Sequence, residues 1–402
     1  MEGGSGRPAH VLVLGAGPAP LGLLEAARAR GLFVVAVDRD PGAPGFPLAD
    51  RRALVSTEDE PAIQRLAEAE RVDGVIAPGT DWPVAIAARV AQRLALPHPI
   101  DAATALLATS KARQRERFVE AEVPHVPWRH AANGTGDVPL PCVVKASDRQ
   151  GQRGMSIVRD RAELAQAIAL ATAESRTGAA LIEELVEGPE VTVNGISLDG
   201  GFHEVAVTDR VVADAPAFGV ALAHVWPSHG DEGTAAPVAA RAAQAIGIRD
   251  GPSYTQLRVG SDGPRVVELA ARLGGGHDGE LCHAAVGVDL NALALKAALG
   301  EEIRPEELVP RARVGGACTV FLVAPPGRLR AVHGMEQARA VDGVIRVRVY
   351  PQPGHEVRPL RHGADRAGAV LAVGENADEA LARGRRAADL VRFETADATI
   401  SV

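Results

Sequence analysis

A strand that ends in a lysine and runs into a glycine-bearing loop limits the folds open to this chain. The segment Pro141–Val158, PCVVKASDRQGQRGMSIV, predicts a buried strand at its start and a second short strand at Met155–Val158. Glycine backbone can bring N–H groups close to phosphate oxygens, and a lysine adds a positive charge. The loop is not a P-loop, because no Gly-Lys-Ser/Thr follows it. On this segment alone, an ordinary hairpin and a nucleotide clamp both stay open.

Lysine is rare in this chain, so the position of each lysine is informative. Of 43 lysine and arginine residues, only three are lysine: Lys111, Lys145 and Lys296. Where arginine serves everywhere else, a lysine marks a place at which a compact ammonium group matters. Lys145 lies where an apolar strand ends, and Lys111 opens a predicted helix behind the N-cap pair Thr109-Ser110. We expect these two lysines to be functional, and Lys296 to be a solvated surface residue of an Ala/Leu-rich helix.

The N-terminal part predicts alternating strands and helices, as in a doubly wound α/β unit. The strand His10–Leu14 ends in Gly15-Ala16-Gly17, and the next predicted strand ends in Asp38. This pattern indicates either a dinucleotide site, with Asp38 on a ribose, or a scaffold whose tight turn needs glycine. The dinucleotide fingerprint is imperfect, because Pro20 stands at its third glycine position. Asp81, at the carboxyl end of a later strand, is expected to face a substrate or to cap the next helix.

Two hairpins follow, and their predicted strands are Val191–Ser197 with Phe202–Thr208, and Ser253–Val259 with Arg265–Ala271. Gln256 and Glu268 fall on adjacent strands of the second hairpin. An amide oxygen and a carboxylate on neighbouring strands can hold Mg²⁺, which takes few protein ligands. Arg272, before three glycines, offers a rigid fork that suits a phosphate or a carboxylate. A surface ion pair between Glu268 and Arg272 is the alternative.

Composition excludes several classes of function. A net charge of −8 argues against nucleic-acid binding, and no apolar run reaches transmembrane length. We find no signal peptide. The three cysteines are widely spaced without a metal-ligand pattern, which fits reduced thiols in the cytoplasm; they are Cys142, Cys282 and Cys318. A length of 402 residues predicts two or three domains.

The order of these features resembles ATP-grasp enzymes of the carboxylate–amine ligase kind. ELAARLGGGHDGEL and the TDR…AHVWPS segment resemble the bacterial L-amino-acid (dipeptide) ligases more than biotin carboxylase. The resemblance covers residues 10–310 well and the rest loosely. It implies an α/β fold with α+β lobes in three parts. These are a Rossmann-like pre-ATP-grasp domain over 1–104, an ATP-grasp domain over 105–310 and a small α+β domain over 311–402. Within the second part, the small lobe would span about 125–182 and the large lobe about 183–310.

The resemblance implies roles for individual residues. ATP would be bound by Lys111, Lys145, Gly151, Gly154, Ser156, Glu183, Glu184, Val186 and Glu190. Of these, Glu183, Glu184 and Val186 would lie at the adenine, and Glu190 at the ribose. Arg272 and Lys145 would be catalytic, and Gln256 and Glu268 would bind the metal. An amino-acid pocket would include His224, His277, Gly275 and Gly276. Two departures stand out: the family often has Asn where this chain has Ala270, and Glu where it has Gln256. Both imply a missed ligand elsewhere or a weaker second metal.

The implied reaction joins a carboxylate and an amine through an acyl phosphate, with release of ADP and phosphate. ATP and Mg²⁺ are the expected cofactors, with Mn²⁺ as the alternative metal. The expected partners are small molecules, with no nucleic acid and no membrane, in a cytoplasmic homodimer. Three alternatives stay open: an ATP-grasp enzyme that carboxylates with bicarbonate, an NAD(P)-dependent reductase, and an ATP-binding module without catalysis.

Overall fold

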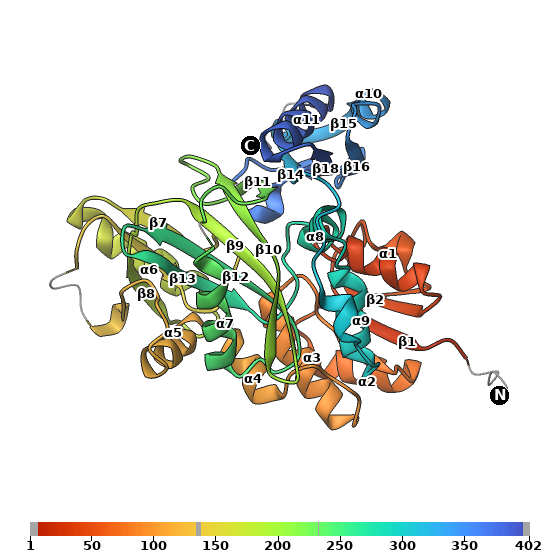
Figure 1. The fold of residues 1–402 in the computed structure, drawn as a ribbon, viewed down its shortest axis with the longest axis horizontal. Helices are drawn as coiled ribbons and strands as arrows, with labels where there is room; N and C mark the ends of the chain where they lie inside the picture. The colour runs from red at the N-terminus through yellow and green to blue at the C-terminus, as the bar shows by residue number, and fades with distance from the viewer. Residues whose placement is uncertain (1–6, 134–137, 232, 397–402) are drawn as a thin grey trace, which may run out of the picture.

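The computed structural model describes residues 7–133, 138–231 and 233–396. The described strands form four sheets. In Figure 1 the C-terminal elements lie above the N-terminal lobe, and the small lobe lies on the opposite side of the central strands from the N-terminal lobe. Alpha/beta and alpha-plus-beta lobes occur together, as the sequence predicts. No single helix of the described residues is long and apolar enough to cross a membrane. Only the bent pair α8 (Asp278–Val286) and α9 (Leu290–Leu299) of the described helices, with 117° between them, meets that length and composition together.

The N-terminal lobe is a parallel sheet in the order β3-β2-β1-β4. Its strands are β1 (His10–Leu14), β2 (Phe33–Asp38), β3 (Arg51–Leu54) and β4 (Gly74–Ile76). Its helices are α1 (Leu21–Ala29), α2 (Glu60–Glu70) and α3 (Asp81–Arg93), with a 3₁₀ turn at Phe46–Leu48. The central strands β1 and β2 are almost wholly buried Val, Leu and Ala, as strands covered on both faces require.

Two helices lead out of this lobe, α4 (Ala102–Ala108) and α5 (Lys111–Glu120). Pro97 and Pro99 predict a linker over Leu96–Ala102, and α4 begins at the last residue of that stretch. Ser110 is the N-cap of α5, and its side chain accepts a hydrogen bond from the Arg113 N–H at 3.5 Å. This cap confirms the predicted helix start at Lys111.

The small lobe is an antiparallel sheet in the order β5-β8-β6-β7, covered by one helix. The elements are β5 (Trp128–His130), β6 (Cys142–Ala146), β7 (Met155–Val158), α6 (Leu164–Glu174) and β8 (Ala180–Glu184), with 3₁₀ turns at Ala131–Asn133 and Arg161–Glu163. Lys145 pairs with Met155 across β6 and β7, so the glycine loop joins two neighbouring strands as predicted.

The central sheet has eight strands in the order β13-β12-β9-β10-β11-β14-β18-β16. They are β9 (Glu190–Leu198), β10 (Gly201–Val212), β11 (Ala221–Trp226), β12 (Gly251–Gly260), β13 (Gly263–Ala270), β14 (Gly316–Leu322), β16 (Val344–Val349) and β18 (Gly368–Gly374). Both predicted hairpins are present as β9–β10 and β12–β13, with antiparallel pairing. Helices α7 (Ala235–Ile246), α8 (Asp278–Val286) and α9 (Leu290–Leu299) pack on this sheet or between it and the N-terminal lobe, with a 3₁₀ turn at Pro305–Leu308.

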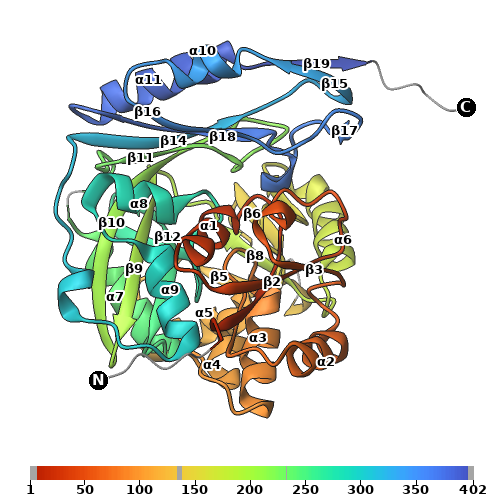
Figure 2. The same ribbon diagram turned by 90° about the vertical axis from the view of Figure 1, so that its right-hand side faces the viewer.

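The expected boundary at residue 311 falls within this sheet, because β14, β18 and β16 extend it beyond β11. Figure 2 shows these strands lying together beneath the C-terminal helices. A further small sheet holds β15 (Gly327–His333), β17 (Glu356–Val357) and β19 (Arg392–Ala396). The remaining elements are α10 (Met335–Arg339), a 3₁₀ turn at Gly363–Asp365 and α11 (Ala377–Leu390).

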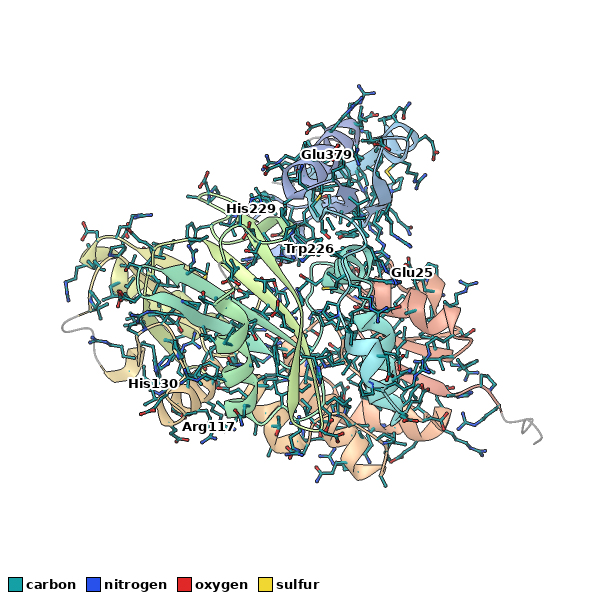
Figure 3. The ribbon with its side chains drawn as sticks, in the orientation of Figure 1. Glu25, Arg117, His130, Trp226, His229 and Glu379 are labelled. Carbon is teal, nitrogen blue, oxygen red and sulfur yellow. The ribbon has the colours of Figure 1, made fainter. Side chains whose placement is uncertain are left out.

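The C-terminal segment also contacts the N-terminal lobe directly. Glu25 on α1, which Figure 3 labels beside the C-terminal strands, accepts hydrogen bonds from Arg346 at 2.8 Å and Arg348 at 2.7 Å. Arg348 also pairs with Glu280 of α8. These ion pairs fix β16 against both α1 and α8, so the lobes meet around one interior space.

Candidate active site

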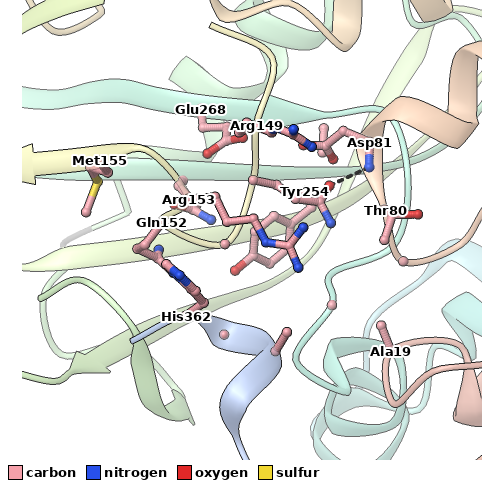
Figure 4. A pocket seen from close by; sticks show the side chains of 18 of the residues that line it. Ala19, Thr80, Asp81, Arg149, Gln152, Arg153, Met155, Tyr254, Glu268 and His362 are labelled. Carbon is pink, nitrogen blue, oxygen red and sulfur yellow. Dashed lines mark hydrogen bonds between the residues drawn. The ribbon is translucent and has the colours of Figure 1, made fainter. Parts of the chain in front are cut away.

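A cavity of about 470 Å³ opens where the lobes meet, and every lobe contributes to its lining. Figure 4 shows Arg149, Gln152 and Arg153 of the glycine loop in the pocket, with Thr80 and Asp81 of the N-terminal lobe nearby. The cavity is lined by most of the predicted site residues: Lys111, Lys145, Gly151, Glu183, Glu184, Val186, Glu190, His224, Gln256, Glu268, Arg272, Gly275 and Gly276. The fold therefore brings together residues that lie far apart in the sequence.

Lys145 is held at the cavity wall by a buried carboxylate. Its ammonium group lies 2.6 Å from Glu183 Oε2, and Arg115 Nη2 lies 2.9 Å from the other oxygen of Glu183. Burial favours the neutral acid, but Arg115 and Lys145 outweigh it and hold the pKa of Glu183 below its usual value. Burial lowers the pKa of Lys145, and the Glu183 carboxylate opposes that shift. Glu183 was expected beside adenine, whereas its carboxylate turns inward to hold this lysine.

Lys111 reaches the same wall from the first turn of α5. Its ammonium group donates to the Arg149 carbonyl at 2.5 Å and lies 2.9 Å from Glu268 Oε1. Burial raises the pKa of Glu268, but Lys111 and Lys145 dominate and lower it. Glu268 is therefore an ionised carboxylate beside two ammonium groups.

The predicted metal ligands face one another, because Gln256 and Glu268 are register partners across β12 and β13. Gln256 Oε1 accepts a hydrogen bond from Arg210 Nη1 at 3.0 Å, so both side chains present oxygen to a positive charge. Among the described residues, no group of three or more His, Cys, Asp and Glu side chains could hold a metal. Two oxygen ligands fit Mg²⁺ that is held mainly by phosphates and water. The donor set present therefore suits that ion.

Arg210 also pairs with Glu190, the residue expected at the ribose, and Arg258 lies 3.1 Å from the same carboxylate. The Arg210 guanidinium therefore contacts both the residue expected at the ribose and a residue expected at the metal. The sequence predicted neither of these two contacts of Arg210, because nothing in a β-strand sequence marks which arginine faces a cavity.

Arg272 pairs with the N-terminal lobe and not with Glu268. Its Nη2 lies 2.6 Å from Asp81 Oδ1, and its Nε donates to the same oxygen at 2.7 Å. The alternative of a Glu268–Arg272 surface pair is therefore wrong, since each partner pairs elsewhere. Thr80 is the N-cap of α3, and Asp81 is not. Asp81 instead presents its carboxylate to the cavity arginine.

The glycine loop contacts the N-terminal lobe across the cavity, because Gln150 Oε1 accepts from the Asp81 N–H at 2.5 Å. Arg176, in the turn between α6 and β8, adds a second contact by pairing with Glu58 of the N-terminal lobe. The Arg176 guanidinium also lies 4.9 Å from the centre of the Trp82 ring. The loop therefore bridges the small lobe and the N-terminal lobe directly across the cavity.

Three predicted site residues do not line the cavity. Gly154 has φ +65°, and a Cβ there would lie 2.7 Å from Glu174 Cβ, so glycine serves a close packing contact. Ser156 lies within β7, opposite Val144. His277 is buried, with Nε2 2.6 Å from the Tyr350 hydroxyl and Nδ1 3.2 Å from Glu280. These contacts give His277 a structural position behind the pocket wall.

His224 does line the cavity, and its Nδ1 lies 2.8 Å from Asp278 Oδ1. Lys296, predicted as solvated surface, is partly buried and lies 2.7 Å from both carboxylate oxygens of Glu307. That prediction was wrong because a lysine on an apolar helix can bury its stem and pair its end. The pair lies outside the cavity.

The Asp38 carboxylate, at the end of β2, accepts hydrogen bonds from the backbone of the neighbouring turns. Its Oδ2 accepts from the Ala16 N–H at 3.0 Å, and its Oδ1 from the Asp40 N–H at 3.0 Å. These bonds favour the scaffold interpretation over a ribose contact.

Comparison with known proteins shows which protein families match this chain. Residues 138–279 match the model of the ATP-grasp domain family, and residues 320–396 match that of the L-amino acid ligase C-terminal domain 2. The chain belongs to the ATP-grasp superfamily. This ATP-grasp protein carries an L-amino acid ligase C-terminal domain, and it is a ligase related to the L-amino acid ligases.

Individual relatives of this ATP-grasp protein are distant. The structure of an L-amino acid ligase from Bacillus licheniformis is similar with a TM-score of 0.82 at 22% identity, over 98% of this chain and 100% of that one. A formate-dependent phosphoribosylglycinamide formyltransferase from Burkholderia pseudomallei is 28% identical, over 95% of each chain. The biotin carboxylase domain of 2-oxoglutarate carboxylase from Hydrogenobacter thermophilus, in complex with MgADP and bicarbonate, has a TM-score of 0.76 at 19% identity, over 96% and 90%.

Proposed function

We propose that this ATP-grasp protein joins a carboxylate to an amine through an acyl phosphate, releasing ADP and phosphate. One observation carries the proposal: two buried lysines, Arg272, the Gln256–Glu268 pair and the glycine loop line one cavity. Positive groups converge there on the space that a triphosphate would fill. The match to an L-amino acid ligase C-terminal domain favours an amino acid or a related acid as substrate.

In this proposal Lys111 and Lys145 hold the ATP phosphates, because both ammonium groups are fixed at the cavity wall. Gly151 lines the cavity beside them. Glu184 and Val186, which follow β8 at the rim, would contact adenine, and Glu190 would contact the ribose. Gln256 and Glu268 would hold Mg²⁺, which neutralises phosphate charge when bound.

Arg272 meets the reacting carboxylate and stabilises the charge that develops as phosphate is transferred. The amine then attacks the acyl carbon, the C–N bond forms, and phosphate leaves with the C–O bond electrons. No protein nucleophile is required, since the residues position and neutralise. The glycine loop excludes water, which would otherwise hydrolyse the acyl phosphate. His224, Gly275 and Gly276 line the space left for the amine and the acid side chain.

The test is a phosphate-release screen over amino acids, alone and in pairs, with mass spectrometry for a new amide. Lys145→Met should abolish release, and Lys296→Met, which removes the rare lysine outside the cavity, should not. ADP release that depends on bicarbonate would replace this proposal with a carboxylase. Nucleotide binding without phosphate release for any pair would leave only an ATP-binding module.

A further inference from the structure

The C-terminal segment contributes an arginine to the cavity that the proposed roles leave unused. Five residues of the C-terminal segment after β14 line the same cavity: Tyr350, His362, Gly363, Ala364 and Arg366. Figure 4 shows the segment at His362 entering the pocket below the glycine loop. A Cβ on Gly151 of that loop would lie 4.0 Å from the Gly363 nitrogen, so the two segments meet.

Arg366 is held in a fixed orientation. Its Nε donates to the Gly363 carbonyl at 2.7 Å, and its guanidinium lies 3.7 Å from the centre of the Phe321 ring. The adjacent acid, Asp365, turns away and accepts from the N–H groups of Arg361 and His362 at 3.1 and 2.8 Å. These contacts leave the two terminal nitrogens of Arg366 as the groups available to the cavity.

Arg366 has no acidic partner among the described residues, in contrast to several other arginines that line the cavity. Arg176, Arg210 and Arg272 each pair with a carboxylate. Within the described parts of the chain, Arg366 has the Gly363 carbonyl and the Phe321 ring as its contacts, and no ion pair.

Arg366 is half-buried, and taking an unpaired charge partly out of water is costly; a ring face and one carbonyl offset only some of that cost. Burial lowers the pKa of Arg366, and Tyr350, Tyr254 and Asp278 oppose that shift only in part. Although the whole chain carries a net charge of −8, ten basic and eight acidic side chains line the cavity. The cavity lining therefore carries a small excess of positive charge, unlike the chain as a whole.

Arg366 also lies near the groups expected at the reacting end. The Phe321 ring that it covers is 5.6 Å, centre to centre, from the ring of His224. Tyr254 affects the pKa of Arg366, and its ring centre lies 5.9 Å from the Arg272 guanidinium. A substrate at His224 and Arg272 is therefore within reach of Arg366.

We propose that Arg366 binds an anionic group, a carboxylate or a phosphate, carried by the amine substrate. This inference rests on the proposed function, in which the lysines take the ATP phosphates and Arg272 takes the reacting carboxylate. Arg366 remains for the second substrate, and its two free nitrogens suit a bidentate contact with either anion. The C-terminal segment thereby selects an amine with a negative charge.

The first experiment compares amines in matched pairs, with the acid and ATP saturating. L-alanine is paired with L-alaninamide, and phosphoethanolamine with ethanolamine, so the two arms separate carboxylate from phosphate. In the wild type, kcat/KM should favour the anionic member of one pair. Arg366→Gln should reduce that preference about 10- to 100-fold, through KM for the amine, because a charged hydrogen bond is lost. Arg366→Lys should fall between the two, since it keeps charge without the fork.

Arg361→Gln is the matched control, because it removes an exposed arginine of the same turn that does not line the cavity. It should retain the wild-type preference. An equal loss for charged and neutral amines in Arg366→Gln, or a raised KM for ATP alone, would overturn the proposal.

A binding experiment separates this proposal from the proposed function. Inorganic phosphate and acetate are titrated by calorimetry into protein saturated with MgADP, so that the nucleotide positions are already filled. One of these anions should bind the wild type and Arg361→Gln, and bind Arg366→Gln about 10-fold or more weakly. If this binding result is obtained but no acid–amine pair is ligated, the anion site is supported and the proposed ligase activity is wrong. Equal binding to all three proteins, or binding to none, would refute the site.

Discussion

Replacing Glu183 by glutamine tests the electrostatic core of this site. The Glu183 carboxylate is buried between the Arg115 guanidinium at 2.9 Å and the Lys145 ammonium at 2.6 Å. Glutamine has nearly the same shape but no charge, so two buried cations would face one another across a neutral amide. The substitution therefore changes charge with little change in packing.

The magnitude follows from the geometry. Two unit charges about 4 Å apart interact by about 4 kcal/mol at an effective dielectric constant near 20. Removing one member of a buried ion pair typically costs about 3–5 kcal/mol, because its partner stays buried without compensation. We expect Glu183→Gln to lower the free energy of unfolding by an amount in that range. The pKa of Lys145 should fall further, since Glu183 is the carboxylate that opposes its burial.

Urea denaturation measures the first effect, and the pH dependence of ATP affinity measures the second. The alkaline loss of ATP binding should begin at lower pH in Glu183→Gln than in the wild type. Glu184→Gln is the control for stability, because this neighbour on β8 is exposed; its effect should stay within about 0.5 kcal/mol. A loss below about 1 kcal/mol with an unchanged pH profile would refute the reasoning.

Three further outcomes are expected. Arg272→Met should reduce kcat/KM about 10²- to 10³-fold, as loss of a preorganised charge-stabilising group does, and near-normal phosphate release would remove it from the mechanism. Gln256→Glu adds a carboxylate opposite Glu268, so a Mg²⁺ titration of activity should reach half-maximum at a lower concentration; an unchanged midpoint would argue against Gln256 as a ligand. Burial raises the pKa of Glu280, but His277 and Arg348 outweigh the effect of burial and hold this pKa well below its usual value. The stability from this carboxylate is therefore full above about pH 4.3 and is lost as pH falls through the lowered value. The melting temperature of Glu280→Gln should therefore fall less on acidification than that of the wild type. Parallel curves of melting temperature against pH would contradict this.

Local patterns predicted much of the fold. Turn glycines and strand alternation located both hairpins, and the pairing of Gln256 with Glu268 followed from strand periodicity. The rarity of lysine separated Lys111 and Lys145 from the many arginines, and both line the cavity. These signals are visible in a sequence because they depend on neighbours along the chain.

Contacts between lobes were not predictable in the same way. Asp81 and Arg272 are 191 residues apart, and no local pattern connects them. Arg115, the partner of Glu183, was not predicted either, although it follows Lys111 by one helical turn and shares its face. Lys296 shows the opposite error, since its partner Glu307 lies beyond the end of its helix. The continuation of the central sheet into β14 was likewise invisible, because strand order is a property of the whole fold.

The shared sheet has a consequence for protein engineering. Phe321 lies on β14, Tyr350 directly follows β16, and Arg366 precedes β18 by two residues, so all three are joined by backbone pairing to the strands that carry Gln256 and Glu268. A chimaera that imports another ligase's C-terminal segment would have to reproduce the β11–β14 pairing, Ala223 with Val320 through Trp226 with Ala317. A graft that slips by one residue would invert the faces of the imported strands and carry Phe321 to the opposite side.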